Sequence, residues 1–232
     1  IDIANALKGE LLQAAAVRML VANVEACDEV WVVSRGAGEN LRHLGYTGEY
    51  RVMQNGVDLP RGPVSPQAAA EAAAGYDLPE GVPVYLFVGR LMWYKGIRLI
   101  LEGLAGLQTA GKDFRMVFVG GGGDEEEIRA QTEQLSLGDK CIFTGPLRDR
   151  EKLRGWYSRA DLLLFPSTFD TNGLVVREAA ACGLPALLIR DSCAAEGVTD
   201  GINGILIRED SAALFAALNS LYGREEFLGR IG

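Results

Sequence analysis

Two basic residues stand close together directly after a short apolar run at residues 84–88. Arg90 follows the run and Lys95 comes five residues later, in a chain that has only five lysines. An arginine offers a planar fork of donors and a lysine a mobile point charge, so the two together can clamp a diphosphate. The same spacing also fits two solvated charges on a loop, and spacing alone leaves both alternatives open.

A second group of polar residues surrounds the expected start of a helix near Gly173. The turn Asn172-Gly173-Leu174 would present free backbone N–H groups and the positive end of the helix dipole, which favour phosphate. Asp170 precedes this helix and Glu178 lies in its second turn. A tight turn would bring both carboxylates to one cleft, where they can accept hydrogen bonds from sugar hydroxyls. The alternatives are an N-cap for Asp170 and a solvated helix position for Glu178.

Four consecutive glycines at 120–123 are followed by four acidic residues at 124–127. The segment contains neither G-x-x-x-x-G-K-[ST] nor G-x-G-x-x-G, which argues against a P-loop and a dinucleotide fingerprint. The acidic residues suit the first turn of a helix and would repel a phosphate there. The glycines would still allow the base or ribose of a nucleotide to lie close to the backbone.

Composition removes several classes of function. The 232 residues include 23 Lys+Arg and 31 Asp+Glu, and the net charge of −8 argues against nucleic-acid binding through bulk electrostatics. The chain has a single histidine, His43, which argues against zinc enzymes built on several histidines. We expect His43 to lie on a surface helix. No G-x-S-x-G motif supports a hydrolase triad. The four cysteines form no C-x-x-C pair and fit a reducing cytosol.

The pattern from residue 84 onward predicts the elements that must position these groups. Short runs of branched and aromatic residues, bounded by Gly or Pro, alternate with amphipathic stretches. This is typical of an α/β fold with a Rossmann-like parallel sheet and helices on both faces. The expected strands are 84–88, 116–119, 141–143, 162–165, 186–189 and 204–207. The expected helices are 97–110, 124–136, 149–159, 173–182 and 210–222.

The first part of the chain reads as the last units of an earlier α/β domain. We assign residues 1–58 to that domain and 59–232 to a second one, with the Pro-, Ala- and Gly-rich segment 59–83 as the crossover. The chain starts with Ile and contains no apolar run near ~18 residues, so we expect a fragment of a longer cytoplasmic protein without a membrane span. The expected elements of the first part are helices at 10–26 and 36–44 and strands at 29–33 and 50–54.

The carboxyl ends of parallel strands form the edge at which ligands bind in open α/β sheets. The loops that begin at Gly89, Gly120, Thr144 and Pro166 each follow one of the expected strands. They should therefore open on a single edge of the sheet. Both cations and both carboxylates discussed above lie in these loops or directly after them.

Several segments recur in the order and spacing of a known enzyme family. They are DEVWVVS (28–34), QNGVD (54–58), VGRLMWYKG (88–96), FTGPL (143–147), the stretch 160–188 and GINGILI (201–207). Together they resemble glycosyltransferase family 4, the retaining, nucleotide-sugar-dependent enzymes of the GT-B fold. The resemblance implies that the chain holds the donor-binding C-terminal domain and the end of the acceptor-side N-terminal domain, most of which is absent from this sequence.

The resemblance implies a role for each charged residue. Arg90 and Lys95 match the pair that stabilises the leaving nucleoside diphosphate. Asp170 and Glu178 match the acidic positions of an E-x7-E motif, the first toward the hydroxyls of the transferred sugar and the second toward the nucleotide ribose. The family usually has Glu where this chain has Asp170, which is one methylene shorter and puts its reach to the sugar, and the choice of donor, in question.

The same resemblance implies a set of uncharged donor-binding positions. Backbone N–H groups of Gly173 and Leu174 would meet the phosphates, and Gly120 and Leu147 would border the nucleoside. Asn172 replaces an often aromatic residue. The full set of expected donor-binding positions beside the four charged residues is Gly89, Gly120, Leu147, Asn172, Gly173 and Leu174.

The function implied by the resemblance is transfer of a hexose from a nucleotide-diphosphate sugar, UDP- or GDP-linked, with retention of configuration. No metal ion or cofactor is expected, because cations and a helix N-terminus would meet the diphosphate charge. The acceptor would be a glycan, a lipid or a small molecule. The missing domain could also bring the protein into peripheral contact with the inner face of the membrane, and the resemblance leaves this open. Alternatives are a GT-B-fold nucleotide-sugar epimerase and a non-catalytic nucleotide-sugar binding module, and the fragment is expected to be inactive alone.

Overall fold

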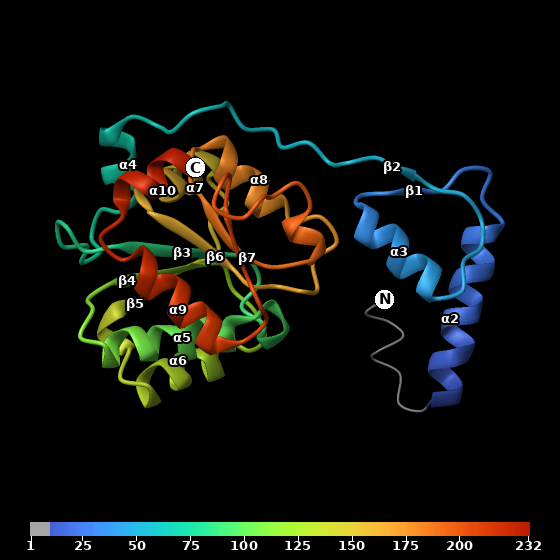
Figure 1. The fold of residues 1–232 in the computed structure, drawn as a ribbon, viewed down its shortest axis with the longest axis horizontal. Helices are drawn as coiled ribbons and strands as arrows, with labels where there is room; N and C mark the ends of the chain where they lie inside the picture. Colours follow the sequence, from blue (N-terminus) through green and yellow to red (C-terminus); the bar gives the residue numbers. More distant parts are fainter. Residues whose placement is uncertain (1–9) are drawn as a thin grey trace. The chain divides into compact units, whose positions relative to one another are not determined.

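The computed structural model describes residues 10–232 and separates the chain into two compact units, up to Asn55 and from Gly56 to Gly232 (Figure 1). The first nine residues of the predicted N-terminal domain lie outside the described residues. The assignment of 1–58 and 59–232 to two domains of a longer protein stays a prediction.

The second unit is built on one six-stranded parallel sheet with the strand order β5-β4-β3-β6-β7-β8. Every residue of the central strand β3 is buried, because helices cover both faces of the sheet. This explains why the strands are continuous apolar runs in the sequence, and it confirms the predicted α/β class. The strands are β3 (Val84–Val88), β4 (Arg115–Val119), β5 (Cys141–Gly145), β6 (Leu162–Phe165), β7 (Ala186–Ile189) and β8 (Ile205–Ile207).

The helices of this unit form two layers on the sheet. Figure 1 shows α5, α6 and α9 on one face and α4, α7, α8 and α10 on the other. Helix α5 packs against α9, and α4 against α7. The helices are α4 (Pro66–Ala72), α5 (Ile97–Thr109), α6 (Glu125–Gln134), α7 (Arg150–Arg159), α8 (Leu174–Ala181), α9 (Ser211–Leu221) and α10 (Glu225–Ile231), with single 3-10 turns η1 (Trp93–Lys95), η2 (Gly138–Lys140) and η3 (Cys193–Ala195).

Between residues 10 and 55, the first unit contains two helices and a short two-stranded parallel sheet. Its strands are shorter than the predicted 29–33 and 50–54, because among the described residues each strand pairs with one neighbour through two residues. His43 ends α3 and is exposed, as predicted. The elements are α2 (Glu10–Glu25), β1 (Trp31–Val32), α3 (Arg35–His43) and β2 (Arg51–Val52).

Over residues 10–232, no helix combines the length and the apolar character needed to cross a bilayer.

Candidate functional site

The strand order places the switch point of the sheet between β3 and β6, where an open parallel sheet has its ligand-binding crevice. From β3 the chain moves outward through β4 and β5 on one side, and from β6 through β7 and β8 on the other. The loops that leave the carboxyl ends of β3 and β6 therefore diverge, which is the position where ligands bind in open parallel sheets. Arg90 and Lys95 follow β3, and Asp170 follows β6.

Glycines allow the loops at this edge to touch through their backbones. A Cβ atom on Gly96 would lie 2.1 Å from the carbonyl oxygen of Pro166, and one on Gly120 would lie 1.9 Å from that of Gly89. Gly96 and Gly120 also have positive φ angles of 77° and 140°. The sequence prediction placed these loops on one edge, and the sheet topology confirms it.

Lys95 and Asp170 form an ion pair across the crevice. The Lys95 Nζ atom donates to both carboxylate oxygens of Asp170 at 2.8 and 2.9 Å. Only 12% of the lysine side chain and 20% of the aspartate side chain are exposed. The two residues lie 75 positions apart in the sequence and are joined only because β3 and β6 are neighbours.

An aromatic pair borders this ion pair. The rings of Tyr94 and Phe169 lie 5.4 Å apart, and the Lys95 ammonium lies 5.4 Å from the Tyr94 ring centroid. Arg90 is exposed, and its guanidinium lies 5.8 Å from the same ring. Arg90 makes no ion pair with an acidic side chain that the structure describes, so its charge has no carboxylate partner there.

Helix α8 begins at the carboxyl end of β6. Gly173 caps the helix in the left-handed conformation, with φ of 58°, and a Cβ atom there would lie within 3.0 Å of Ala194. Leu174 opens the helix and is 42% exposed. The first N–H groups of a helix have no partner within it, so this turn can donate to an anion.

Glu178, in the second turn of α8, is held by a residue that the sequence analysis did not identify. The Tyr157 hydroxyl donates to Glu178 Oε2 at 2.8 Å. Tyr157 is 1% exposed, and its burial, with the neighbouring Glu178 carboxylate, raises the pKa of the phenol above its ordinary value. The phenol therefore stays a donor at neutral pH and leaves Glu178 Oε1 for another partner.

Asn172 carries an unsatisfied amide in the same loop. It is 7% exposed, and neither Oδ1 nor Nδ2 has a hydrogen-bond partner within the described chain. The Ser167 Oγ atom, on a fully buried residue of this loop, is also unpaired there. Buried polar groups are normally paired, so a ligand with hydroxyl or amide groups would gain by supplying the partner.

The glycine-rich turn after β4 has a structural role of its own. Asp124 accepts from the backbone N–H of Trp93 at 2.8 Å, and Glu127 accepts from the Trp93 indole at 2.9 Å. These carboxylates therefore hold η1, the turn that carries Lys95. Leu147 packs half-buried against the core after β5. No three His, Cys, Asp or Glu side chains of residues 10–232 gather closely enough to hold a metal ion.

Comparison with known proteins gives the family. Residues 70–231 match the family model "Glycosyl transferases group 1". The D-inositol 3-phosphate glycosyltransferase of Xylanimonas cellulosilytica is 30% identical over 194 residues, covering 79% of this chain and 46% of the relative. The chain thus spans about half the length of the curated relatives it matches.

Two solved structures show the same fold. Anabaena HepE in complex with UDP-glucose gives a TM-score of 0.84 at 22% identity, over 94% of this chain and 60% of that chain. Sucrose-phosphate synthase from Thermosynechococcus elongatus gives a TM-score of 0.81 at 26% identity, over 99% of this chain and 58% of that chain. The likeness confirms the predicted GT-B type of Rossmann-like fold. With the family model covering most of the sequence, the chain belongs to the group 1 glycosyltransferases.

Proposed function

We propose that this chain supplies the donor-binding domain of a retaining hexosyltransferase that uses a nucleotide-diphosphate sugar. The observation that carries the proposal is the Lys95–Asp170 ion pair, which spans the crevice between β3 and β6 beside the start of α8. A cation, a carboxylate and a helix N-terminus meet there, and these are the groups that bind a diphosphate joined to a sugar.

In this proposal the charge that develops on the leaving diphosphate is met by three groups. They are the Lys95 ammonium, the Arg90 guanidinium and the first N–H groups of α8. Donors aimed at a developing charge in a partly enclosed site supply most of the stabilisation in reactions of this kind. No metal ion or cofactor is invoked, and Gly89, Gly120 and Leu147 border the nucleoside.

The carboxylates bind hydroxyl groups in the same proposal. Donor binding draws Lys95 toward the diphosphate and leaves Asp170 to accept from the transferred sugar, while Glu178 Oε1 accepts from the ribose. Asn172 pairs its amide with a further sugar hydroxyl. Asp170 is not assigned as a covalent nucleophile, because its role in this proposal is to accept hydrogen bonds from the hydroxyl groups of the transferred sugar.

A UDP-linked sugar is the first donor to test. Anabaena HepE was solved with UDP-glucose, and the fold of this chain is the same. The family match favours a glycosyltransferase over an epimerase or a non-catalytic binding module. The acceptor, whether glycan, lipid or inositol phosphate as in the name of the curated relatives, would be decided by parts of the protein outside this chain.

Calorimetric titration of the chain with UDP, GDP and ADP in metal-free buffer tests the proposal. We expect UDP to bind selectively and Lys95→Ala to weaken it by roughly 1.5–3 kcal/mol, the scale of a charged hydrogen bond. The matched control is Lys152→Ala, which removes the same charge from an exposed position on α7. Failure of all three nucleotides to bind, or equal affinity in Lys95→Ala and the wild-type chain, would overturn the proposal.

A further inference from the structure

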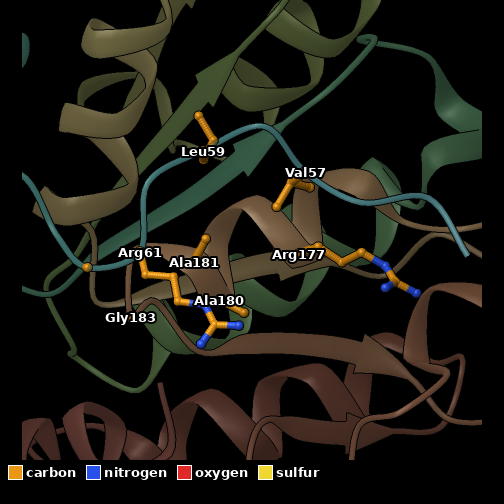
Figure 2. Close-up of a pocket in the computed structure, with 8 residues that line it drawn as sticks. Val57, Leu59, Arg61, Arg177, Ala180, Ala181 and Gly183 are labelled. Atoms are coloured by element: carbon orange, nitrogen blue, oxygen red, sulfur yellow. The ribbon is translucent and has the colours of Figure 1, made fainter.

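A second concave surface forms where the segment that follows Asn55 passes over α8, and none of the proposed donor-binding residues lines it. The groove has a volume of about 590 Å³, within the range of small-molecule sites. Figure 2 shows Val57 and Leu59 on the passing segment, with the helix beneath them. The lining combines aliphatic side chains with two arginines, Arg61 from the segment and Arg177 from α8, and contains no acidic residue.

Neither arginine is neutralised by the protein. Among residues 10–232, neither Arg61 nor Arg177 has an ion pair or side-chain hydrogen bond. The acidic residues beside the groove have other partners: Asp58 pairs with Arg150 at 3.1 Å, and Glu178 accepts from Tyr157. Two unpaired guanidinium groups in a chain of net charge −8 mark this groove as a site for anions.

The groove is held open by fixed contacts rather than by the arginines themselves. The Gly62 N–H donates to the carbonyl of Ala181 at 2.7 Å, and Arg154 donates to the Gly62 carbonyl at 3.3 Å. The Val64 N–H donates to the Ser158 hydroxyl at 3.0 Å. The segment is therefore fastened to α7 and α8 directly after Arg61, which fixes the backbone at that end of the groove.

The arrangement of the two arginines selects the kind of anion. Figure 2 shows their side chains leaving from different ends of the labelled set and not pointing toward one another. A single phosphate group would meet one guanidinium, whereas an elongated molecule could meet both and lay its body on Val57, Leu59 and the alanines of α8. We propose that this groove binds a soluble small molecule with two separated phosphate groups, independently of the nucleotide-sugar crevice.

The test compares fructose 1,6-bisphosphate, fructose 6-phosphate and fructose as probes of the whole chain. Backbone amide NMR shifts of Gly62, Ala181 and Gly183 report on the groove, and those of Gly173 and Leu174 report on the crevice. We expect the bisphosphate to shift the groove amides with an affinity at least about tenfold above that of the monophosphate, because it gains a second charged hydrogen bond. Fructose should cause no shift.

Variants locate the binding to the two guanidinium groups. Arg61→Gln and Arg177→Gln should each lower the bisphosphate affinity to that of the monophosphate, while the response of Gly173 and Leu174 to UDP is unchanged. The control Arg18→Gln/Arg224→Gln removes two exposed positive charges elsewhere and should have no effect. The proposal would be overturned by any of three results. These are equal affinities for fructose 1,6-bisphosphate and fructose 6-phosphate, unchanged bisphosphate binding in both groove variants, and shifts confined to Gly173 and Leu174. A failure of UDP to bind would leave the groove measurement unaffected.

Discussion

At the scale of single residues, the crevice holds two of its charges as a mutually neutralised pair. Lys95 and Asp170 are bound to each other and are largely shielded from solvent. A diphosphate must compete with Asp170 for the lysine, and a sugar hydroxyl must compete with the lysine for Asp170. The ion pair thus couples the binding of the two halves of a nucleotide sugar. A diphosphate that binds Lys95 releases Asp170 for the sugar, and a sugar that binds Asp170 releases Lys95 for the diphosphate.

Asp170→Asn tests this link. Removing the carboxylate charge frees Lys95, so the affinity for UDP should rise by about 1 kcal/mol, the upper scale of a partly exposed ion pair. The additional affinity of UDP-glucose over UDP should fall, because the amide is a poorer acceptor for sugar hydroxyls. Calorimetric titration with both ligands gives the two changes. A lower affinity for UDP in Asp170→Asn would contradict the competition.

Tyr157 acts on the nucleotide through Glu178. In Tyr157→Phe the carboxylate loses the donor that orients it, and the affinity for UDP should fall by roughly 0.5–1.5 kcal/mol. The affinity for the 2′,3′-dideoxy analogue of UDP should not change, because that ligand offers Glu178 no ribose hydroxyl. Tyr85→Phe, at another buried tyrosine, is the control for a general loss of stability. Equal losses for both ligands would show that Tyr157 is structural only.

At the scale of elements, the site depends on two loops that touch. Gly96 ends η1 and contacts the carbonyl of Pro166 after β6, so any side chain there pushes the loops apart. Lys95 and Asp170 lie on the two sides of this contact. The backbone approach at Gly96 is therefore what allows the ion pair to form.

Gly96→Ala should both destabilise the fold and weaken UDP binding. The free energy of unfolding should drop by about 1–3 kcal/mol more than in Gly111→Ala, because overpacking adds to the left-handed strain. Gly111 is the matched control, since its φ is 73° and nothing lies within 4 Å of an added Cβ. Urea unfolding measures the difference. Equal stability of the two variants would show that the contact at Gly96 relaxes without cost.

The elements of the second unit could be predicted because each depends on the pattern of apolar and polar residues within its own segment. The run at 84–88 coincides with β3, since a strand covered on both faces must be apolar at every position. The pairing of Lys95 with Asp170 could not be predicted, because it depends on β6 lying beside β3. Tyr157 was overlooked for the same reason, because its partner Glu178 lies 21 residues away on another helix. Arg61 and Arg177 of the groove were given no role by any motif that the sequence analysis recognised, so the groove could not be predicted either.

At the scale of the whole molecule, all the proposed donor-binding residues belong to the second unit. The first unit ends at Asn55, whereas the proposed site begins at Gly89 and ends at Glu178. The groove residues also follow Asn55 in the sequence. The second unit should therefore bind the nucleotide without help from the first.

Limited proteolysis tests this independence. Residues 53–56 are exposed and belong to no helix or strand, so brief digestion with proteinase K should cut there first. The purified larger fragment should keep the affinity of the whole chain for UDP within about 0.5 kcal/mol, because distant and independent parts contribute additively. Mass spectrometry identifies the cut and calorimetry gives the affinity. A marked loss of affinity in a folded fragment would mean that the first unit contributes directly to the nucleotide site, and the proposed set of donor-binding residues would then be incomplete.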